Sequence, residues 1–420
     1  MRVLVLGSGG REHALCWKLA QSPLLSQLFC CPGNEGIAQI ATCISGEPVE
    51  VAQQIGADFV VVGPDGLLAD GIVDRLNSVG IRAFGPTKQA AQLESSKIFC
   101  KNLLRKYQIP TAQAASFDSP DDAKTYISNL PDDVPVVVKA DGLAVGKGVV
   151  VAQNRAEAIA AVDEVLGIAH STSGENNRVL VEEWMTGEEV SLMAITDGET
   201  ILPFATAQDH KRIGEGDVGA NTGGMGCYSP VPAFSTKQFD DAIENILKPT
   251  LAGLKAEGIR YRGVLYAGLM LTPNGTRVVE FNARFGDPET QVVLPRLKSD
   301  LLPLLLACSG HIEYSIAELP CEWTDEAAVC VVMAAGGYPA AYQKGDAISG
   351  LPQAAQNGAL VFHAGTSLRD NQIVTDGGRV LGITALGDGF HDAREKCYDA
   401  VEKIGFDGAY FRRDIGWRCL

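Results

Sequence analysis

Residues 138–149 read VKADGLAVGKGV, and this stretch decides the fold of the middle of the chain. It follows an apolar run at 134–138 and precedes another at 149–151, so both flanks are predicted to be strands. The stretch fails the P-loop pattern, because its Gly-Lys pair is followed by Gly148 and then by a strand instead of a helix. A glycine-rich hairpin loop between two strands is therefore expected.

The segment after this hairpin is predicted to be a helix at 154–166 followed by a strand at 179–184. The resulting order of strand, loop, strand, helix and strand differs from a βαβ repeat. Lys139 and Lys147 flank the loop, which suits a lid that folds over a triphosphate, and Lys97 could supply a third cation. An ordinary β-hairpin with exposed lysines is the alternative.

Residues 1–100 alternate short apolar runs with helical patterns, which is typical of a doubly wound parallel sheet. In such sheets ligands bind beyond the carboxyl ends of the strands, and the glycine-rich turns of this segment fall there. The expected strands are 3–6, 28–31, 59–62 and 82–84.

The first of these turns reads GSGGREH at 7–13 and invites comparison with the dinucleotide-binding fingerprint. It fails that fingerprint because Glu12 stands where the third glycine is required, and a carboxylate there would repel a pyrophosphate. A mononucleotide or sugar phosphate could still bind to the backbone amides of Gly9 and Gly10, with Arg11 as counter-charge. A tight turn without a ligand fits the spacing equally well.

Residues 278–291 read VVEFNARFGDPETQ. Side chains alternate along a strand, so Glu280 and Asn282 are predicted to share one face. A carboxylate beside an amide oxygen suits Mg²⁺ that bridges substrate phosphates. Arg284 continues the same face if the strand persists, where it could stabilise an anionic transition state. A polar edge strand is the alternative.

Two further segments carry weaker signals. Carboxylates that include Glu189 follow the strand at 179–184, which could offer backbone groups to an adenine edge. The run QDHKR at 208–212 leads to a glycine-rich turn, NTGGMG at 221–226, and together they could form a second anion or substrate site. A solvated acidic turn and a mobile surface loop are the respective alternatives.

The rest of the chain is expected to hold a long helix around 236–257 and strands at 263–271 and 277–282. From about 326 we expect short strands at 328–334, 359–363 and 379–386 and a helix near 390–404. The expected domains are 1–100, 101–325 with a lid subdomain at about 120–190, and 326–420.

Composition excludes several classes of protein. The 420 residues include 35 Lys and Arg against 51 Asp and Glu, and the net charge of −16 would repel nucleic acid. The 11 cysteines have no C-x-x-C or zinc-finger spacing, so they are predicted to be reduced thiols. No apolar run approaches the roughly 18 residues of a membrane span, and no signal peptide is recognisable, so we expect a cytoplasmic protein. No obligatory protein partner is evident.

Together these segments resemble the ATP-grasp superfamily, in which two α+β subdomains hold ATP between them. Within it, the sequence is similar to the phosphoribosylamine–glycine ligases of purine biosynthesis, in order and over essentially the whole chain. The motifs that carry this resemblance are 5–14, 138–149, 209–212, 221–226, 284–291, 334–339 and 414–417. The tract RFGDPETQ at 284–291 is highly specific.

The resemblance implies an N-terminal doubly wound sheet, a central ATP-grasp fold of two subdomains and a small C-terminal α+β domain. It implies ATP-dependent joining of glycine to 5-phosphoribosylamine, which gives glycinamide ribonucleotide, ADP and phosphate through a glycyl phosphate. Phosphorylation turns a poor acyl donor into a good one, and the amine then attacks without help from an enzyme nucleophile. The sequence agrees, since it contains no recognisable Ser-His or Cys-His motif.

The resemblance also implies roles for individual residues. The implied ATP contacts are Lys97, Lys139, Gly142, Gly146, Lys147, Gly148, Glu182, Trp184 and Glu189, with Glu182 and Trp184 at adenine and Glu189 at ribose. The implied ligands of Mg²⁺ or Mn²⁺ are Glu280 and Asn282. The implied substrate contacts are Gly9, Gly10, Arg11, Lys211, Arg212, Asn221, Gly223, Gly224 and Asp287, and the implied catalytic cations are Arg284 and Lys147.

Three alternatives remain. Another ATP-grasp ligase or carboxylase is the nearest, and the tract at 284–291 argues against it. A dinucleotide-dependent oxidoreductase is disfavoured by Glu12, and a non-catalytic nucleotide sensor by the intact Glu280 and Lys139. Many ATP-grasp enzymes carry another carboxylate ligand on the preceding strand. Residues 264–270 contain none, which leaves the number of metal ions open.

Overall fold

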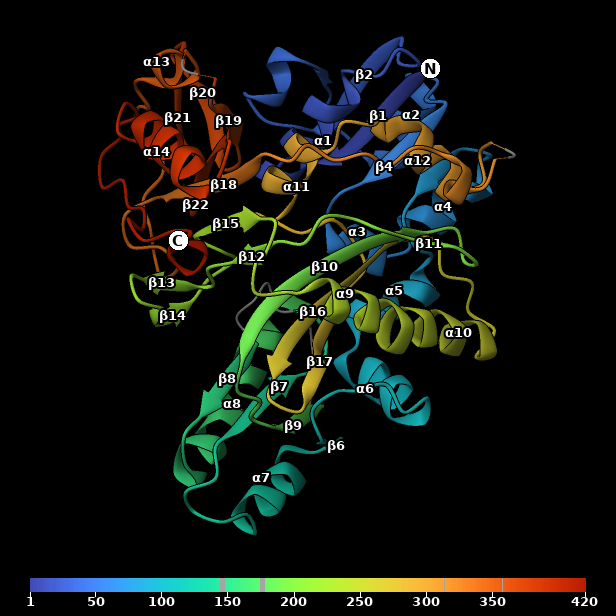
Figure 1. Ribbon diagram of the computed structural model, residues 1–420, viewed down its shortest axis with the longest axis vertical. Helices are drawn as coiled ribbons and strands as arrows, with labels where there is room; N and C mark the ends of the chain where they lie inside the picture. Colours follow the sequence, from blue (N-terminus) through green and yellow to red (C-terminus); the bar gives the residue numbers. More distant parts are fainter. Residues whose placement is uncertain (144–147, 174–177, 313, 357) are drawn as a thin grey trace.

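The computed structural model describes residues 1–143, 148–173, 178–312, 314–356 and 358–420. In Figure 1 the N-terminal and C-terminal units lie side by side at the top, and the segment 114–183 extends downward from them. The long strands β10 (Glu188–Thr196), β16 (Gly263–Thr272) and β17 (Gly275–Asn282) run between these two levels (Figure 1). This multidomain α/β architecture agrees with the fold class that the sequence predicted.

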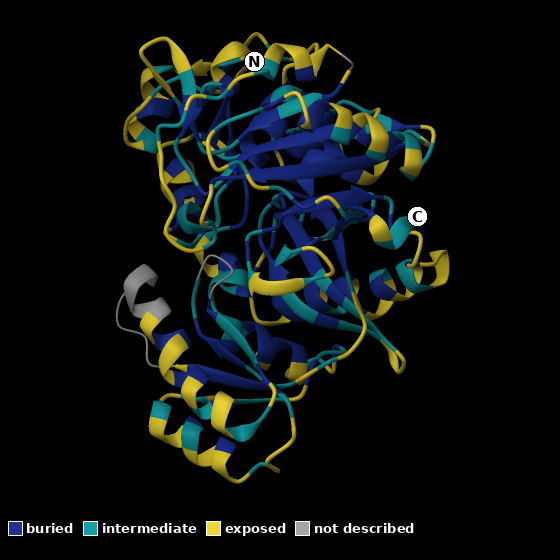
Figure 2. Cartoon of the chain, turned by 90° about the vertical axis from the view of Figure 1, so that its left-hand side faces the viewer, coloured by how far each residue is buried: buried dark blue, intermediate teal, exposed yellow. Residues whose placement is uncertain are grey.

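The N-terminal unit is a parallel sheet in the order β3-β2-β1-β4-β5, as predicted. Its strands are β1 (Arg2–Gly7), β2 (Gln27–Pro32), β3 (Thr42–Cys43), β4 (Phe59–Val62) and β5 (Arg82–Phe84). Its helices are α1 (Gly10–Leu19), η1 (Ile37–Gln39), α2 (Pro48–Gln54), α3 (Asp65–Ala69) and α4 (Ile72–Ser78). Every residue of β4 is buried, because the sheet is covered on both faces (Figure 2).

The segment expected as a lid has the predicted order of elements. Two helices, α5 (Lys88–Ser95) and α6 (Lys97–Lys106), lead into it. Its elements are β6 (Ala114–Phe117), α7 (Pro120–Ser128), β7 (Val136–Ala140), β8 (Val149–Ala152), α8 (Arg155–Ser173) and β9 (Val179–Glu183). The strands form an antiparallel sheet in the order β6-β9-β7-β8, and its apolar face makes a separate small core with α7 and α8.

The central sheet has the order β11-β10-β16-β17, with β11 at Ile201–Pro203. The single long helix expected around 236–257 is instead α9 (Thr236–Ala242), a π-helical turn η2 (Ile243–Leu247) and α10 (Lys248–Ala256). Pro249 explains the difference, because proline lacks the N–H that a regular α-helix would use at that position.

The C-terminal sheet has the order β12-β15-β18-β22-β19, so two strands from the middle of the chain complete it. Its strands are β12 (Gln208–Asp209), β15 (Gly226–Ser229), β18 (Ala327–Ala334), β19 (Leu360–His363) and β22 (Arg379–Gly387). Two hairpins lie beside it, β13 (Arg212–Gly214) with β14 (Val218–Asn221) and β20 (Thr366–Arg369) with β21 (Gln372–Thr375). The remaining elements are α11 (Thr290–Arg296), α12 (Leu301–Cys308), η3 (Ile316–Glu318), α13 (Leu351–Ala355), α14 (Phe390–Val401) and η4 (Trp417–Cys419).

The units share apolar cores. Residues of β1 and α1 pack in one cluster with α11, α12 and β18, and a second cluster joins the central sheet to β18 and β22. Among the described residues, no helix is long and apolar enough to cross a membrane.

Candidate active site

A buried cluster of lysines and carboxylates lies where β7 and β9 meet β17. Lys139 and Lys101 bind the two oxygens of Glu182 at 2.6 and 2.7 Å. Burial alone would raise the pKa of Glu182, but the charges of Lys139 and Lys101 outweigh it and lower the pKa. Both oxygens of Glu182 are therefore already bound by lysines. The resemblance implied instead that this side chain contacts adenine, and nothing in the sequence indicated the two lysine contacts.

Lys97 stands at the first position of α6 and reaches the glycine-rich loop. Its Nζ donates to the Gly142 carbonyl at 2.6 Å, and burial lowers its pKa. The Gly148 carbonyl accepts the Ala140 N–H at 3.1 Å and closes the base of the hairpin. Gly146 and Lys147, both expected at the nucleotide, lie outside the described residues.

Glu280 and Asn282 lie on β17 with no bulge between them, opposite Gly268 and Tyr266 of β16. They therefore share one face, as the alternation predicted. Burial would raise the pKa of Glu280, but nearby cations, Lys211 and Lys139 first, lower it and keep the carboxylate ionised.

This donor set fits a divalent metal bound together with phosphates. An ionised carboxylate and an amide oxygen are hard ligands, and the surrounding lysines would neutralise phosphate charge. No group of three or more His, Cys, Asp and Glu side chains in the described ranges is arranged to hold a metal ion. A metal on Glu280 and Asn282 would therefore take its remaining ligands from phosphate oxygens and water.

Arg284 was expected on this strand face if the strand persisted, but β17 ends at Asn282, so that condition is not met. Arg284 instead makes an ion pair with Glu94 at 3.2 Å and donates to the Phe285 carbonyl at 3.3 Å. Burial would lower the pKa of Arg284, but the charge of Glu94 raises it. Its Nε is buried without a hydrogen-bond partner in the described structure, so this donor remains open to a ligand.

A cavity of about 420 Å³ opens at the carboxyl ends of β1, β2 and β4. Its lining includes Gly9, Arg11, Glu12 and Asp287. It therefore brings the first glycine turn to the tract at 284–291, which lies far away in the sequence.

Glu12 and Gln291 occupy the space beside the glycines of that turn. The Glu12 carboxylate accepts the Gly9 N–H at 2.6 Å and the Arg11 Nε–H at 2.6 Å. A Cβ on Gly7 would lie 2.5 Å from the Glu12 Cγ, and a Cβ on Gly10 would lie 2.6 Å from the Gln291 Nε2. The Gly9 amide, expected to bind phosphate, is thus already taken, and Arg11 keeps only part of its donors for a ligand.

Arg379, from the C-terminal sheet, contacts Asp287, which lines this cavity. It binds the Asp287 carboxylate at 3.3 Å and the Asp287 carbonyl at 2.9 Å, and it also donates to the Gly223 carbonyl. The Gly223 N–H donates to the Tyr338 hydroxyl at 3.0 Å. The predicted Gly223, Gly224 and Asp287 are therefore brought together.

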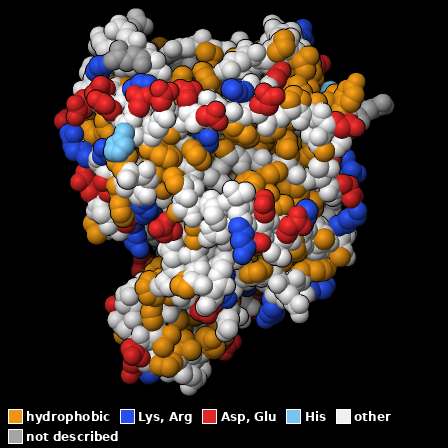
Figure 3. Space-filling model, in the orientation of Figure 1, with side chains coloured by type: hydrophobic (Ala, Val, Ile, Leu, Met, Phe, Trp, Pro, Cys, Tyr) orange, Lys and Arg blue, Asp and Glu red, His pale blue; other side chains and the backbone are white. Residues whose placement is uncertain are grey.

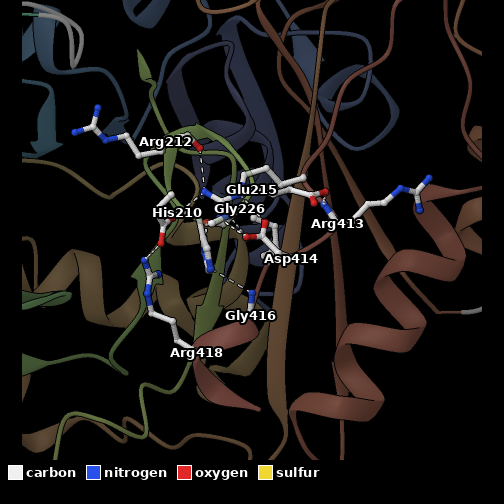
Figure 4. A network of polar contacts seen from close by, with 12 residues as sticks. His210, Arg212, Glu215, Gly226, Arg413, Asp414, Gly416 and Arg418 are labelled. Carbon is white, nitrogen blue, oxygen red and sulfur yellow. Dashed lines mark hydrogen bonds and ion pairs between the residues drawn. The ribbon is translucent and has the colours of Figure 1, made fainter. Parts of the chain in front are cut away.

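The other predicted residues lie in three places. Lys211 pairs with Glu189 beside the Glu280 cluster. Arg212 and Asn221 pair across the β13–β14 hairpin, and the Arg212 side chain points away from His210 (Figure 4). Trp184 follows β9 and is 44% exposed.

His210, which belongs to the run at 208–212 considered as an anion or substrate site, is fully buried. Burial and the neighbouring Arg418 lower its pKa to about 4, so it is neutral at pH 7. It accepts the Gly416 N–H at 3.3 Å, in the network that ties β13 and β14 to the C-terminal segment (Figure 4). Its role in this structure is to join two segments.

Sequence reasoning missed Lys101, Glu94 and Arg379. Glu94 stands directly before the Ser-Ser pair that precedes Lys97, but no pattern links it to Arg284. Arg379 comes from a different sheet, and only the fold brings it to Asp287.

Comparison with known proteins agrees with this arrangement. Three family models match in order: the phosphoribosylglycinamide synthetase N domain at 1–94, its ATP-grasp (A) domain at 95–290 and its C domain at 328–418. Relatives named phosphoribosylamine–glycine ligase from Agrobacterium fabrum and Nostoc sp. are 46% and 50% identical to this chain. Each alignment covers 100% of this chain and 99% of the relative.

Solved structures agree as well. A phosphoribosylamine–glycine ligase from Thermotoga maritima superposes with a TM-score of 0.86 at 36% identity, over 99% of this chain and 100% of that one. A biotin carboxylase from Campylobacter jejuni gives a TM-score of 0.73 at 14% identity, over 97% of this chain and 92% of that one, which shows a shared fold alone. The resemblance predicted from the sequence is confirmed: the chain belongs to the phosphoribosylglycinamide synthetase family.

Proposed function

We propose that the cluster around Glu280 and the cavity beside Asp287 act together, using ATP to join glycine to 5-phosphoribosylamine. The products are glycinamide ribonucleotide, ADP and phosphate. Membership of the family makes the chain an ATP-dependent ligase that forms a carbon–nitrogen bond. The observation that carries the division of labour is the tract at 284–291, which leaves the end of β17 and reaches the cavity at Asp287.

The nucleotide phosphates bind between Lys97, Lys139 and the glycine-rich loop with Gly142, Gly146, Lys147 and Gly148. Glu280 and Asn282 hold Mg²⁺ or Mn²⁺, which when bound draws charge from the phosphate oxygens. Glu182 serves this site by holding Lys139 in place, because both of its oxygens bind lysine. Trp184, through its backbone, and Glu189 contact adenine and ribose.

The chemistry needs cations more than it needs a nucleophile. Transfer of a phosphoryl group to the glycine carboxylate brings two anions together, and Lys139, Lys147 and Arg284 offset the repulsion. The open Nε of Arg284 supports this role, since a guanidinium can donate in two directions at once. The amine of phosphoribosylamine then attacks the glycyl phosphate and displaces phosphate.

Phosphoribosylamine occupies the cavity of the N-terminal sheet. Gly9, Arg11 and Asp287 line this cavity, and Gly10 follows Gly9 at the start of α1. Lys211, Arg212, Asn221, Gly223 and Gly224 belong to the segment that closes the substrate region from the C-terminal sheet.

The chain works on small molecules, without a nucleic acid or an obligatory protein partner, in the cytoplasm. Acidic and basic side chains are interspersed on the face in Figure 3, which supports the proposal that the chain does not bind nucleic acid. All 11 cysteines are free, as a reducing compartment requires.

An ADP-release assay tests the proposal. We expect ADP only when ATP, glycine and phosphoribosylamine generated in situ are all present, and we expect chelation of divalent metal to abolish it. Release driven by bicarbonate, or independent of glycine, would contradict the proposal and favour another ATP-grasp activity.

A further inference from the structure

Glu94 is a buried carboxylate that none of the roles above uses. It is the next-to-last residue of α5, and α6 begins at Lys97, so both belong to one short connection, residues 94–98, which we call the α5–α6 joint. The side chain of Glu94 is 8% exposed. Carboxylates are rarely buried to this extent unless they are paired, so the contacts of Glu94 indicate what it does.

The two oxygens of Glu94 bind two consecutive residues just beyond the end of β17. Oε2 accepts the Ala283 backbone N–H at 2.8 Å, and Oε1 pairs with the Arg284 Nη2 at 3.2 Å. The strand itself ends at Asn282, an expected metal ligand. One carboxylate therefore holds both the backbone and the guanidinium at the point where the chain leaves β17.

The contacts of Arg284 define the orientation of its guanidinium. Nη1 donates to the Phe285 carbonyl at 3.3 Å, Nη2 is paired with Glu94, and Nε is buried without a partner in the described chain. A planar guanidinium that is held through both terminal nitrogens cannot turn, so the direction of its Nε–H is fixed. Glu94 thus helps to decide where the open donor points.

The α5–α6 joint is itself anchored to the base of the glycine-rich hairpin. The Asp141 carboxylate accepts the Ile98 N–H at 3.1 Å and the Ser96 hydroxyl at 3.1 Å. Lys97 Nζ donates to a carbonyl of the loop that follows, at 2.6 Å. The same joint therefore holds a lysine expected at the nucleotide phosphates and, through Glu94, the guanidinium of Arg284.

The charge of Glu94 matters as well as its shape. A glutamine could also accept the Ala283 N–H, but it would offer no charge to Arg284, and Glu94 is the one carboxylate in an ion pair with Arg284 among the described residues. Burial raises the pKa of Glu94, and the charge of Arg284 opposes that rise. The pair holds the guanidinium in place before any substrate binds, as preorganised stabilisation of a transition state requires.

We propose that Glu94 is a positioning residue for the reaction: it acts through Arg284 and places the cation that offsets charge on the transferred phosphoryl group. This inference rests on the proposed function, which gives Arg284 that role. Glu94 itself touches no substrate, because both of its oxygens are engaged. The alternative is a contact that only joins α5 to the central sheet and contributes stability alone.

Steady-state kinetics and urea denaturation of Glu94→Gln test this inference. The amide can accept the Ala283 N–H but cannot pair with the guanidinium, so kcat should fall on the order of 10- to 100-fold, as it does when a catalytic group is slightly misplaced. KM for ATP should stay within about twofold. Asp300→Asn is the matched control, because it removes a partly buried carboxylate that accepts a hydroxyl and a backbone N–H at the start of α12. Asp392→Asn, an exposed carboxylate on α14, is a second control.

A double variant separates positioning from stability. Arg284→Met removes the guanidinium, so adding Glu94→Gln to it should change kcat by less than about threefold, since the interaction is already lost. If the two single losses multiply in the double variant, Glu94 does not act through Arg284 and the positioning role is overturned. A lower urea midpoint with unchanged kcat in Glu94→Gln would overturn it as well.

Glu94→Asp decides the question if the amide variant folds poorly. It keeps the charge but is too short to hold Ala283 and Arg284 together, so kcat should still fall by about 10-fold or more. Wild-type kcat in Glu94→Asp would overturn the positioning role. If the wild type itself releases no ADP with glycine and phosphoribosylamine, the proposed function fails, whereas normal turnover of both wild type and Glu94→Gln refutes the positioning role alone.

Discussion

Two carboxylates of the same cluster, Glu182 and Glu280, both lie near Lys139 and differ in how they are used. Glu182 binds Lys139 and Lys101 through both oxygens and is 4% exposed. Glu280 is surrounded by cations that lower its pKa, yet its side chain makes no hydrogen bond within the described chain. A saturated carboxylate positions its neighbours, whereas an ionised and unsaturated one is prepared for a ligand.

The largest expected effect is that of a substitution of Glu280, the carboxylate that makes no hydrogen bond among the described residues. Glu280→Gln keeps the shape and removes the charge that favours a divalent cation, so kcat/KM should fall by about 10³ or more with the fold intact. Measurement of kcat/KM against Mg²⁺ concentration, with Asp392→Asn as control, checks this. Normal turnover of Glu280→Gln at limiting Mg²⁺ would show that Glu280 is not prepared for a metal ion and does not differ from Glu182 in this respect.

Arg284 comes next, because its Nε is open while its other nitrogens bind Glu94 and a carbonyl. Arg284→Lys cannot reproduce a planar guanidinium, so kcat should fall on the order of 10²–10³ with little change in KM for ATP. An effect confined to KM for phosphoribosylamine would instead make Arg284 a ground-state contact of that substrate.

Substitution of Glu182, whose two oxygens both bind lysine, should mainly lower the free energy of unfolding. Glu182→Gln removes the carboxylate that pairs with both Lys139 and Lys101, and removal of one partner of a buried pair costs about 3 kcal/mol or more. Urea denaturation measures the loss. Adding Lys101→Met to Glu182→Gln should recover part of it, and full additivity of the two changes would show that the pair is not coupled.

The effect that is smallest at pH 7 concerns a buried contact without charge. The His363 backbone N–H on β19 donates to the His13 Nδ1 on α1 at 2.8 Å. Burial, and then His363, lower the pKa of His13 to about 3, and burial lowers that of His363 to about 4. The unfolded chain, with histidine pKa values near 6.5, binds more protons below that pH.

Stability should therefore be fully present above pH 6.5 and fall as the pH drops toward 4, by up to about 1.4 kcal/mol per pH unit for each histidine. His13→Gln should make the profile of unfolding free energy against pH shallower in this window. An unchanged slope would mean that other groups control the acid limb.

Short-range patterns predicted most of the fold. The apolar runs of β1, β2, β4 and β5 and the hairpin around the glycine-rich loop form where expected, because alternation and turn residues act between near neighbours. The shared face of Glu280 and Asn282 follows from the same two-residue period.

The candidate site was predicted less completely. Arg284 was expected to continue the face of β17, but the strand ends two residues earlier, at Asn282. Nothing in the local sequence marks this end. The turn at 7–10 was interpreted as space for phosphate, whereas part of that space holds Glu12. In both cases the deciding partner is a side chain whose position depends on packing.

The sequence by itself determined the class of fold, the family and the residue types that carry charge to the site, since motifs and periodicity are properties of consecutive residues. Only the tertiary structure decided which charges cancel and which stay open. Lys139 is paired with a residue of β9, Asp287 is bound by Arg379 of the C-terminal sheet, and Asp209 has Glu289 as its neighbour. Coulomb energies and desolvation depend on distance in space, so chain separation does not reveal them.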